Sequence, residues 1–336
     1  MLIKAILLSL IAGCMNGSYP AFLKKVTFPT DFIWFVFSLL TFGLAPWIAL
    51  SLLGDHSLLL LESISLKYFY ILLIGGFCFG LGMILFVFGL KYVGISVSFI
   101  LNIAVGTVIG SILPVILLNP SKLASAGGLA QITALIVFLI ALCFMMTASK
   151  NREATVSEKS VFKGKNIIGI LVGSLSGLLT SAQGFVYSYC LPFVTSASVS
   201  IDAPKMTSTL LIWALIFNAA LLPYALFFLV RFLRSNEKLT SKHSFKNSIF
   251  LIVMSIFYYG SIIVFSKASI SLGSMGSVIA WPILMITIIL TSNFWGWKQC
   301  EWKNSGIKAI KSQKASIVFL LIAVVLLTVA GYFNLS

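Results

Sequence analysis

The charged residues of this chain lie in or at the edges of the gaps between ten long apolar stretches. The 336 residues include 23 lysines and arginines and 8 aspartates and glutamates, and 60% of all residues are hydrophobic. Because a charged side chain is costly at the centre of a bilayer, long stretches without charge indicate membrane spans. The pattern predicts an all-α integral membrane protein with ten transmembrane helices.

Each apolar stretch is long enough to cross a membrane. A helix needs about 20 apolar residues to cross a hydrocarbon layer about 30 Å thick. Ten such helices leave short loops and no room for a separate soluble domain. Small residues at helical spacing, such as Gly76 and Gly80, predict close packing between helices. The predicted spans are residues 2–20, 32–53, 68–90, 93–117, 129–148, 167–190, 207–230, 247–266, 275–296 and 315–333.

Positive charge is unevenly divided between the two sides of the predicted membrane. All three arginines and most lysines follow spans 1, 3, 5, 7 and 9, whereas the other side holds only Lys4, Lys67, Lys122, Lys205 and Lys267. Lysine and arginine accumulate in cytoplasmic loops. We therefore expect a multi-pass protein of the cell membrane, the inner membrane of a bacterium, with both termini outside. The same distribution argues against a nucleic-acid partner despite the net charge of +15.

The most polar stretch of the chain separates two halves of five spans each. Span 1 carries Asn16 and Gly17, and span 6 carries Gln183 and Gly184, in each case with a serine seven positions before the amide residue. An odd number of spans per half inserts the second half upside down, which predicts an inverted-topology repeat of the kind found in many secondary transporters. The predicted domains are an N-terminal repeat (1–148), a polar cytoplasmic linker (149–166) and a C-terminal repeat (167–336).

The polar residues inside the predicted spans are neutral. Asparagine and glutamine are costly in lipid unless they face a partner or water, so they either join two helices or line a cavity. Asn16 and Gln183 occupy matching positions in the two halves, and Trp281 precedes Pro282, which is expected to kink span 9. The predicted substrate-binding residues are Asn16, Tyr19, Asn102, Gln183, Tyr187, Asn218, Tyr258, Tyr259, Ser277 and Trp281.

The absence of charge inside the spans constrains the substrate. Without an arginine, acid or histidine in the interior, neither an anion nor a cation has a partner there, and a small neutral solute such as a sugar fits best. The nearest candidates for coupling transport to H⁺ or Na⁺ are Asp31 and Lys267, although each is also explained as an interfacial charge whose side chain snorkels to water. Scattered cysteines and the lack of a phosphate-binding loop predict no metal, no cofactor and no enzyme.

Several segments resemble the L-rhamnose–proton symporter family of the drug/metabolite transporter superfamily. They are residues 20–26 (PAFLKKV), 46–47 (PW), 89–96 (GLKYVGIS) and 301–306 (EWKNSG), in the order and spacing of that family. The resemblance implies ten helices in two inverted repeats and uptake of a small sugar-like solute with an ion. The chain departs from the family at Ser277, where an acidic residue is expected, and at 267–269, where Lys-Ala-Ser replaces His-Ala-Arg.

Three other functions remain open at this point. A carrier of the same fold could export metabolites or amphipathic compounds, since direction depends on the gradients. The chain could instead be a membrane enzyme acting on lipid-linked substrates, with only Asp31, Lys91 and Lys267 near an interface to contribute, or a non-transporting assembly factor. The predicted partners are the lipid bilayer, a neutral solute and H⁺ or Na⁺, with the protein as a monomer or homodimer.

Overall fold

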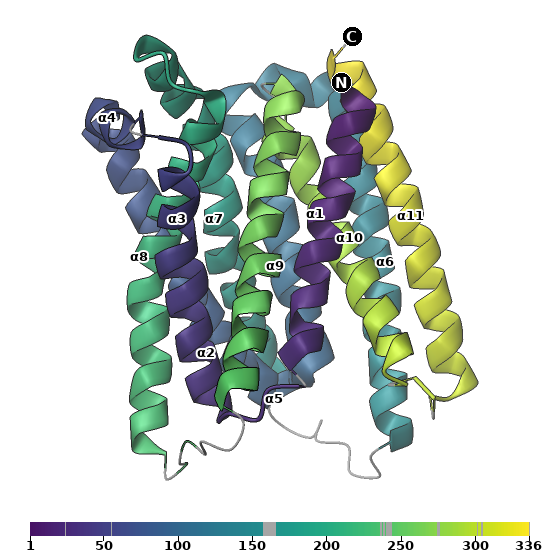
Figure 1. The fold of residues 1–336 in the computed structure, drawn as a ribbon. Helices are drawn as coiled ribbons and strands as arrows, with labels where there is room; N and C mark the ends of the chain where they lie inside the picture. Colours follow the sequence, from purple (N-terminus) through teal and green to yellow (C-terminus); the bar gives the residue numbers. More distant parts are fainter. Residues whose placement is uncertain are drawn as a thin grey trace.

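The computed structural model describes the backbone of the chain apart from residues 24, 55, 157–165, 236, 238, 240–243, 274–275, 301, 304 and 336. The side chains of 90–100, 153–156, 166–167, 244, 277 and 334–335 are likewise not described. Within the described part every regular element is a helix (Figure 1). The elements are α1 (Leu2–Leu23), α2 (Thr30–Ser38), η1 (Leu39–Leu44), α3 (Ala45–Ser51), α4 (His56–Ser63), α5 (Leu66–Leu118), η2 (Pro120–Ala124), α6 (Ala126–Val156), α7 (Asn166–Ser200), α8 (Lys205–Arg234), α9 (Ser244–Ser271), α10 (Gly276–Lys298) and α11 (Ile307–Leu335).

The described helices provide ten segments that are long and apolar enough to cross a membrane, which confirms the ten predicted spans. Many large apolar side chains on their outer surface are exposed, among them Leu222, Leu226, Leu321 and Val325. Such a surface is characteristic of contact with lipid rather than water. The chain is therefore a multi-pass helical membrane protein. Helix α6 continues to Val156, into the segment predicted as a polar linker.

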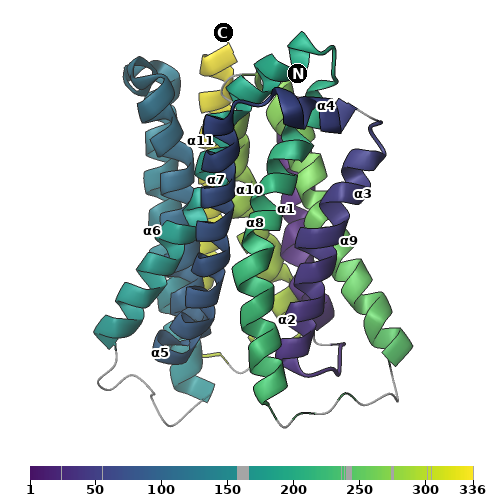
Figure 2. The same ribbon diagram turned by 90° about the vertical axis from the view of Figure 1, so that its left-hand side faces the viewer.

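The two chain termini lie at the same end of the bundle (Figure 1). We call this the terminal end, and we call the opposite end, where α6 ends and α7 begins, the linker end. Helix α9 begins at the linker end, as does α2, whereas α8 finishes there (Figures 1 and 2).

Helix α5 contains spans 3 and 4 and turns back on itself between them. Its 53 residues would extend about 80 Å if they formed a straight helix. The Ser176 hydroxyl on α7 donates to the carbonyl oxygen of Gly82 at 2.8 Å and accepts from Nδ2 of Asn102 at 2.7 Å. These two residues would lie about 30 Å apart on a straight helix. The chain therefore reverses direction between them, and Leu66–Gly89 and Leu101–Leu118 cross the bilayer separately.

Span 2 changes from α-helical to π-helical hydrogen bonding in its middle. Helix α2 passes into the π-helical turn η1, and α3 begins with Pro46 in its first turn. Proline has no N–H to donate to the carbonyl of residue 42, four positions earlier, so the regular hydrogen-bond ladder cannot continue there. A π-helical turn is a common result of such a local interruption and is frequent at functional sites.

Glycines allow several pairs of helices to approach closely. Helix α1 packs against α9 and α10, and α7 packs against both spans of α5. A Cβ atom on Gly17 would lie 2.7 Å from the carbonyl oxygen of Ile288 on α10, and a Cβ atom on Gly80 would lie 2.6 Å from that of Ala220 on α8. Because neither backbone could remain in place beside a larger residue, the expectation of close packing at these glycines is confirmed.

Candidate functional site

Four aromatic side chains from four helices meet in the interior of the C-terminal half. Tyr187 of α7 stacks on Trp213 of α8, with ring centroids 4.7 Å apart and planes inclined by 22°. Trp213 lies nearly parallel to Trp281 of α10 at 6.3 Å, and Phe265 of α9 meets Trp281 edge-on at 5.7 Å. Tyr187, Trp213 and Phe265 are fully buried and Trp281 is 4% exposed. We call Tyr187, Trp213, Phe265 and Trp281 the interior aromatic cluster.

Several polar atoms around this cluster lie within reach of one another without a hydrogen bond of full geometry. The Tyr187 hydroxyl lies close to the hydroxyls of Ser266 and Ser269 and to the Trp213 indole, yet none of these contacts has the geometry of a hydrogen bond. The indole nitrogen of Trp281 is also buried without a partner. Buried polar groups are nearly always satisfied, and an unsatisfied one costs about 1–3 kcal/mol. Several in one place indicate a site whose partner is a ligand or water.

Two glycines leave the space that the Trp281 indole occupies. A Cβ atom on Gly184 of α7 would lie 3.0 Å from Cε2 of Trp281, and one on Gly110 of α5 would lie 3.2 Å from its Nε1. The indole therefore fills a slot between α5 and α7, helices from different halves of the chain. Any movement of α10 relative to these helices changes the space around the interior aromatic cluster.

The donor and acceptor chemistry of this cluster suits a neutral ligand. Indole nitrogens donate only, whereas the tyrosine and serine hydroxyls both donate and accept. No charged group is among these residues. Apolar rings combined with a few convergent polar groups are typical of small-molecule sites.

Of the predicted substrate-binding residues, the structure brings Tyr187 and Trp281 into this cluster, and it adds residues that the sequence reasoning did not name. These are Trp213, Ser266 and Ser269. Trp213 carried a usable signal, because a tryptophan in the interior of a span is unusual when most tryptophans of membrane proteins lie at the interfaces. The serines carried little signal, since serine is common in helix-packing faces.

Three predicted amides lie elsewhere and are held in different ways. Asn102 donates to the hydroxyls of Ser176 at 2.7 Å and Thr180 at 3.0 Å, which joins α5 to α7. Asn16 donates to the Ser261 hydroxyl at 2.9 Å, which joins α1 to α9. Asn102 and Asn16 therefore make helix-to-helix hydrogen bonds, which the sequence analysis gave as the alternative to lining a cavity. Gln183, by contrast, is half-buried and makes no hydrogen bond to any residue that the structure describes.

The Asn218 side chain forms hydrogen bonds to span 2 beside its π-helical turn and does not face an interior site. Its Nδ2 donates to the carbonyl oxygen of Phe42 at 3.3 Å and to that of Ala214 at 2.8 Å. The Phe42 carbonyl is the group that loses its usual helical donor because residue 46 is proline. The Oδ1 atom of Asn218 accepts from the Trp47 indole at 3.1 Å. Each polar atom of this side chain therefore has a partner within the protein.

The remaining predicted tyrosines belong to a second aromatic group. Tyr19 of α1 stacks on Phe37 at 5.4 Å and meets Tyr258 edge-on at 5.2 Å. Phe217 of α8 connects this group to the interior aromatic cluster, with centroids 6.1 Å from both Tyr258 and Tyr259 and 5.3 Å from Trp213. The Ser277 side chain lies outside the described part.

An apolar groove of about 420 Å³ lies between span 2 and α9. Its walls are formed by η1 and α3 on one side and by the middle of α9 on the other, and Tyr259 is one of its lining residues. Its two lining polar residues are Tyr259 and Ser255, and the Ser255 hydroxyl is already bonded to Thr41 at 2.8 Å. The surface of the groove is therefore almost entirely apolar.

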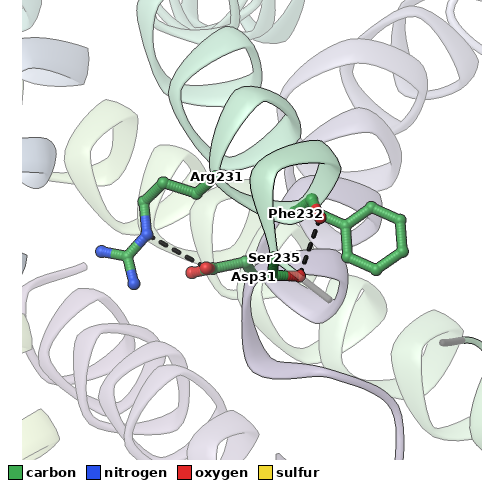
Figure 3. A network of polar contacts seen from close by, with 4 residues as sticks. All are labelled: Asp31, Arg231, Phe232 and Ser235. Atoms are coloured by element: carbon green, nitrogen blue, oxygen red, sulfur yellow. Dashed lines mark hydrogen bonds and ion pairs between the residues drawn. The ribbon is translucent and has the colours of Figure 1, made fainter. Parts of the chain in front are cut away.

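The two coupling candidates lie at opposite ends of the bundle. Asp31, in the first turn of α2, pairs with Nε of Arg231 at 3.0 Å near the linker end, where Ser235 bonds to the Phe232 carbonyl in the next turn (Figure 3). Arg231 lies within the last turn of α8, not in a loop as the sequence suggested. Lys267, near the end of α9, is exposed and forms no ion pair with a described residue.

Several contacts join the two halves of the chain near the linker end. Besides the ion pair of Asp31 with Arg231, the buried Asn247 of α9 exchanges hydrogen bonds with Thr27, 3.2 Å from its backbone nitrogen and 3.0 Å from its hydroxyl. Phe22 also meets Phe257 edge-on at 5.3 Å. These contacts tie the segment between spans 1 and 2 to α8 and α9.

No protein-family model matches the sequence, and no curated protein is significantly similar to it. The resemblance to sugar symporters therefore stays a prediction. Among the described residues no group of histidine, cysteine, aspartate and glutamate side chains could hold a metal ion.

Proposed function

We propose that this protein is a secondary transporter of a small neutral polar solute, with a sugar or sugar-like compound as the substrate class. The interior aromatic cluster and its unsatisfied hydroxyl and indole groups carry this proposal. A hydroxyl-rich solute between these rings would satisfy those groups without requiring a charge. The site draws on α7, α8, α9 and α10, and Trp281 contacts α5 of the other half.

We further propose that the chain is an inverted repeat that works by alternating access. The packing of the spans supports this. Span 1 packs against spans 8 and 9, and span 6 packs against spans 3 and 4, while span 2 meets span 7 and span 5 meets span 10. Exchanging each span with its counterpart five spans away maps each of these contacts onto another of them or onto itself, whereas the contact of span 6 with span 7 has no equally close counterpart between spans 1 and 2. Sites at the interface of two such repeats are reached by rocking one repeat against the other.

Binding of a neutral solute is tested most directly by thermal stabilisation of the purified protein. Sugars, polyols, nucleosides and amino acids are screened for a rise in melting temperature, because a ligand that binds only the folded state stabilises it. A neutral hit is then followed as uptake into proteoliposomes. Stabilisation only by lipid-linked compounds would favour the membrane enzyme instead.

The Ser269→Ala variant connects a hit to the proposed site. Its hydroxyl is buried beside that of Tyr187 without a hydrogen bond of full geometry, so its removal is expected to change the stability of the folded protein little. We expect the variant to keep its melting temperature and lose stabilisation by the ligand. Ser9→Ala is the matched control, since Ser9 is equally buried but bonds to the carbonyl of Ala5 at 2.9 Å, away from the cluster. Equal ligand response in both variants would contradict the site.

Gln183 and Asn16 provide a further test of the lining of the transport path. Gln183 is half-buried without a hydrogen bond in the described part, and Asn16 has its amide nitrogen committed to Ser261. We expect Gln183→Ala to reduce uptake more than Asn16→Ala does. If both variants transport as the wild type does, neither residue lines the path.

A second candidate function is supported by the groove beside span 2. Tyr259 lines the groove, and Phe217 lies between Tyr259 and Trp213 of the interior aromatic cluster. A compound with a polar part and an apolar tail could use both regions. An efflux carrier for amphipathic compounds is therefore the alternative, and alkyl glycosides that stabilise the protein more than the free sugars do would favour it.

A further inference from the structure

We propose that the groove between span 2 and α9 binds one phospholipid of the bilayer, with an acyl chain along the groove and the phosphate at Lys267. This inference goes beyond transport, because it concerns a lipid that the protein holds and does not depend on the substrate. The depth, length and lining of the groove and the charge beside it point to this occupant.

The groove lies at the depth of the lipid acyl chains. All its lining residues except Leu52, which directly follows span 2, belong to the membrane-spanning segments Thr30–Ser51 and Phe245–Ser271. It is open at the side, and Leu44, Ile48 and Ile256 on its rim are about half exposed. Since no water is present in the bilayer core, hydrocarbon is what meets this surface.

The length of the groove matches one acyl chain in one leaflet. On span 2 the lining runs from Leu40 to Leu52, and on α9 it runs from Ile252 to Ile263. With a rise of 1.5 Å per residue, each wall is about 17 Å long. One leaflet contributes about 15 Å of the hydrocarbon layer. On span 2 the groove extends from the middle of the span to its end at the terminal side, whereas on α9 its lining is centred on the middle of the span. The end of the groove nearest Lys267 therefore faces the leaflet at the terminal end.

Lys267 supplies a positive charge at the end of the groove where the lipid phosphate would lie. Ile256, Gly260, Ile263 and Lys267 follow one another at spacings of three or four residues, which places them on one face of α9. Lys267 is thus one turn beyond the last lining residue, toward the terminal end, and its exposed ammonium group forms no ion pair in the described part. A lysine is a common partner for phosphate. The apolar groove and the charge together match a phospholipid better than a fatty acyl chain alone.

The proposal is tested with phosphatidylglycerol that carries a photoactivatable group in its acyl chain, added to the full-length protein in vesicles. After illumination, adducts are mapped by peptide mass spectrometry. We expect several-fold more labelling on residues 40–52 and 252–263 than on the exposed face of α11 around Leu321 and Val325. Equal labelling of the two surfaces would mean that the groove is ordinary lipid-facing surface, and the proposal would be wrong.

Variants separate the two parts of the proposed site. Ala45→Phe fills the groove, and Lys267→Gln removes the charge, so each is expected to lower lipid retention in native mass spectrometry several-fold. The controls are Ala219→Phe, on the α8 face that carries the exposed Leu222, and Lys205→Gln, another exposed lysine. Should Ala45→Phe fail to fold, Ile48→Phe fills the same groove from an exposed position.

Three further results would each count against the proposal. Retention that Lys267→Gln leaves unchanged, or equal retention of a diacylglycerol without phosphate, would overturn the phosphate contact. An interchain disulfide formed in vesicles by the Ile256→Cys variant, with loss of groove labelling, would assign the groove to a second copy of the chain.

Discussion

The contact between span 3 and span 7 predicts a measurable cost for adding one methyl group. In the wild type, a Cβ atom on Gly80 would lie 2.6 Å from the carbonyl oxygen of Ala220, 2.8 Å from Cγ of Pro223 and 3.0 Å from Cα of Ala220. Ordinary contacts of a Cβ atom begin near 3.4 Å. Gly80→Ala therefore forces α5 and α8 apart by about 0.8 Å, because neither the carbonyl nor the proline ring is a flexible side-chain end.

The magnitude follows from two opposing effects. Overpacking of a well-packed interior costs about 1–3 kcal/mol. Replacing glycine by alanine inside a helix stabilises that helix by up to about 1 kcal/mol, which opposes the cost of overpacking. Gly106→Ala is the matched control on the same helix, since its Cβ would meet nothing closer than 3.8 Å. We expect Gly80→Ala to be less stable than Gly106→Ala by about 1–3 kcal/mol.

Thermal unfolding of the detergent-purified variants measures this difference. At about 2–4 °C per kcal/mol, Gly80→Ala should melt several degrees below Gly106→Ala. The close approach also predicts that lengthening the residue further, as in Gly80→Val, lowers the melting temperature again. Equal melting temperatures for the alanine variants would refute the reasoning, because they would mean that α5 and α8 do not pack at the distance observed.

Three further predictions concern the site and the ends of the spans. Gly184→Ala places a methyl group 3.0 Å from Trp281 and should displace its indole, seen as a shifted tryptophan fluorescence, and an unchanged spectrum would contradict this contact. Asp31→Asn removes a pair in which the Arg231 side chain is 34% exposed, so the stability loss should stay below about 1 kcal/mol, and a larger loss in thermal unfolding would contradict a surface role. Asn218→Leu leaves a backbone carbonyl and an indole without partners and should lower stability by about 1–3 kcal/mol in the same assay, an expectation that an unchanged melting temperature would disprove.

The prediction of membrane spans succeeded because it depends on composition alone. A run of residues without charge partitions into lipid whatever its neighbours are, so the ten spans could be located before any contact was known. The same is true of the glycines, whose spacing on a helix predicts close packing without naming the partner. The turn inside α5 could also be predicted, because a straight helix of 53 residues would be longer than a bilayer is thick.

The roles of the predicted site residues could not be read from the sequence, for a physical reason. An amide in a span needs a partner, but the sequence does not say whether that partner is another helix or a ligand. Asn218 illustrates the difficulty: its role depends on the missing N–H of Pro46, which lies far away in the sequence on another span. Ser266 and Ser269 show the reverse case, because only their lack of partners in the folded protein distinguishes them from ordinary packing serines.

By itself, then, the sequence determined that this is a ten-span membrane protein with a neutral interior, because the cost of charge in lipid acts on each residue separately. The tertiary structure alone decided which polar groups remain unsatisfied, where the apolar groove lies, and that Asp31 pairs with Arg231. Those features depend on how each helix is rotated and how near its neighbours lie. Side-chain partners across helices set them, and no local pattern in the chain encodes such partners.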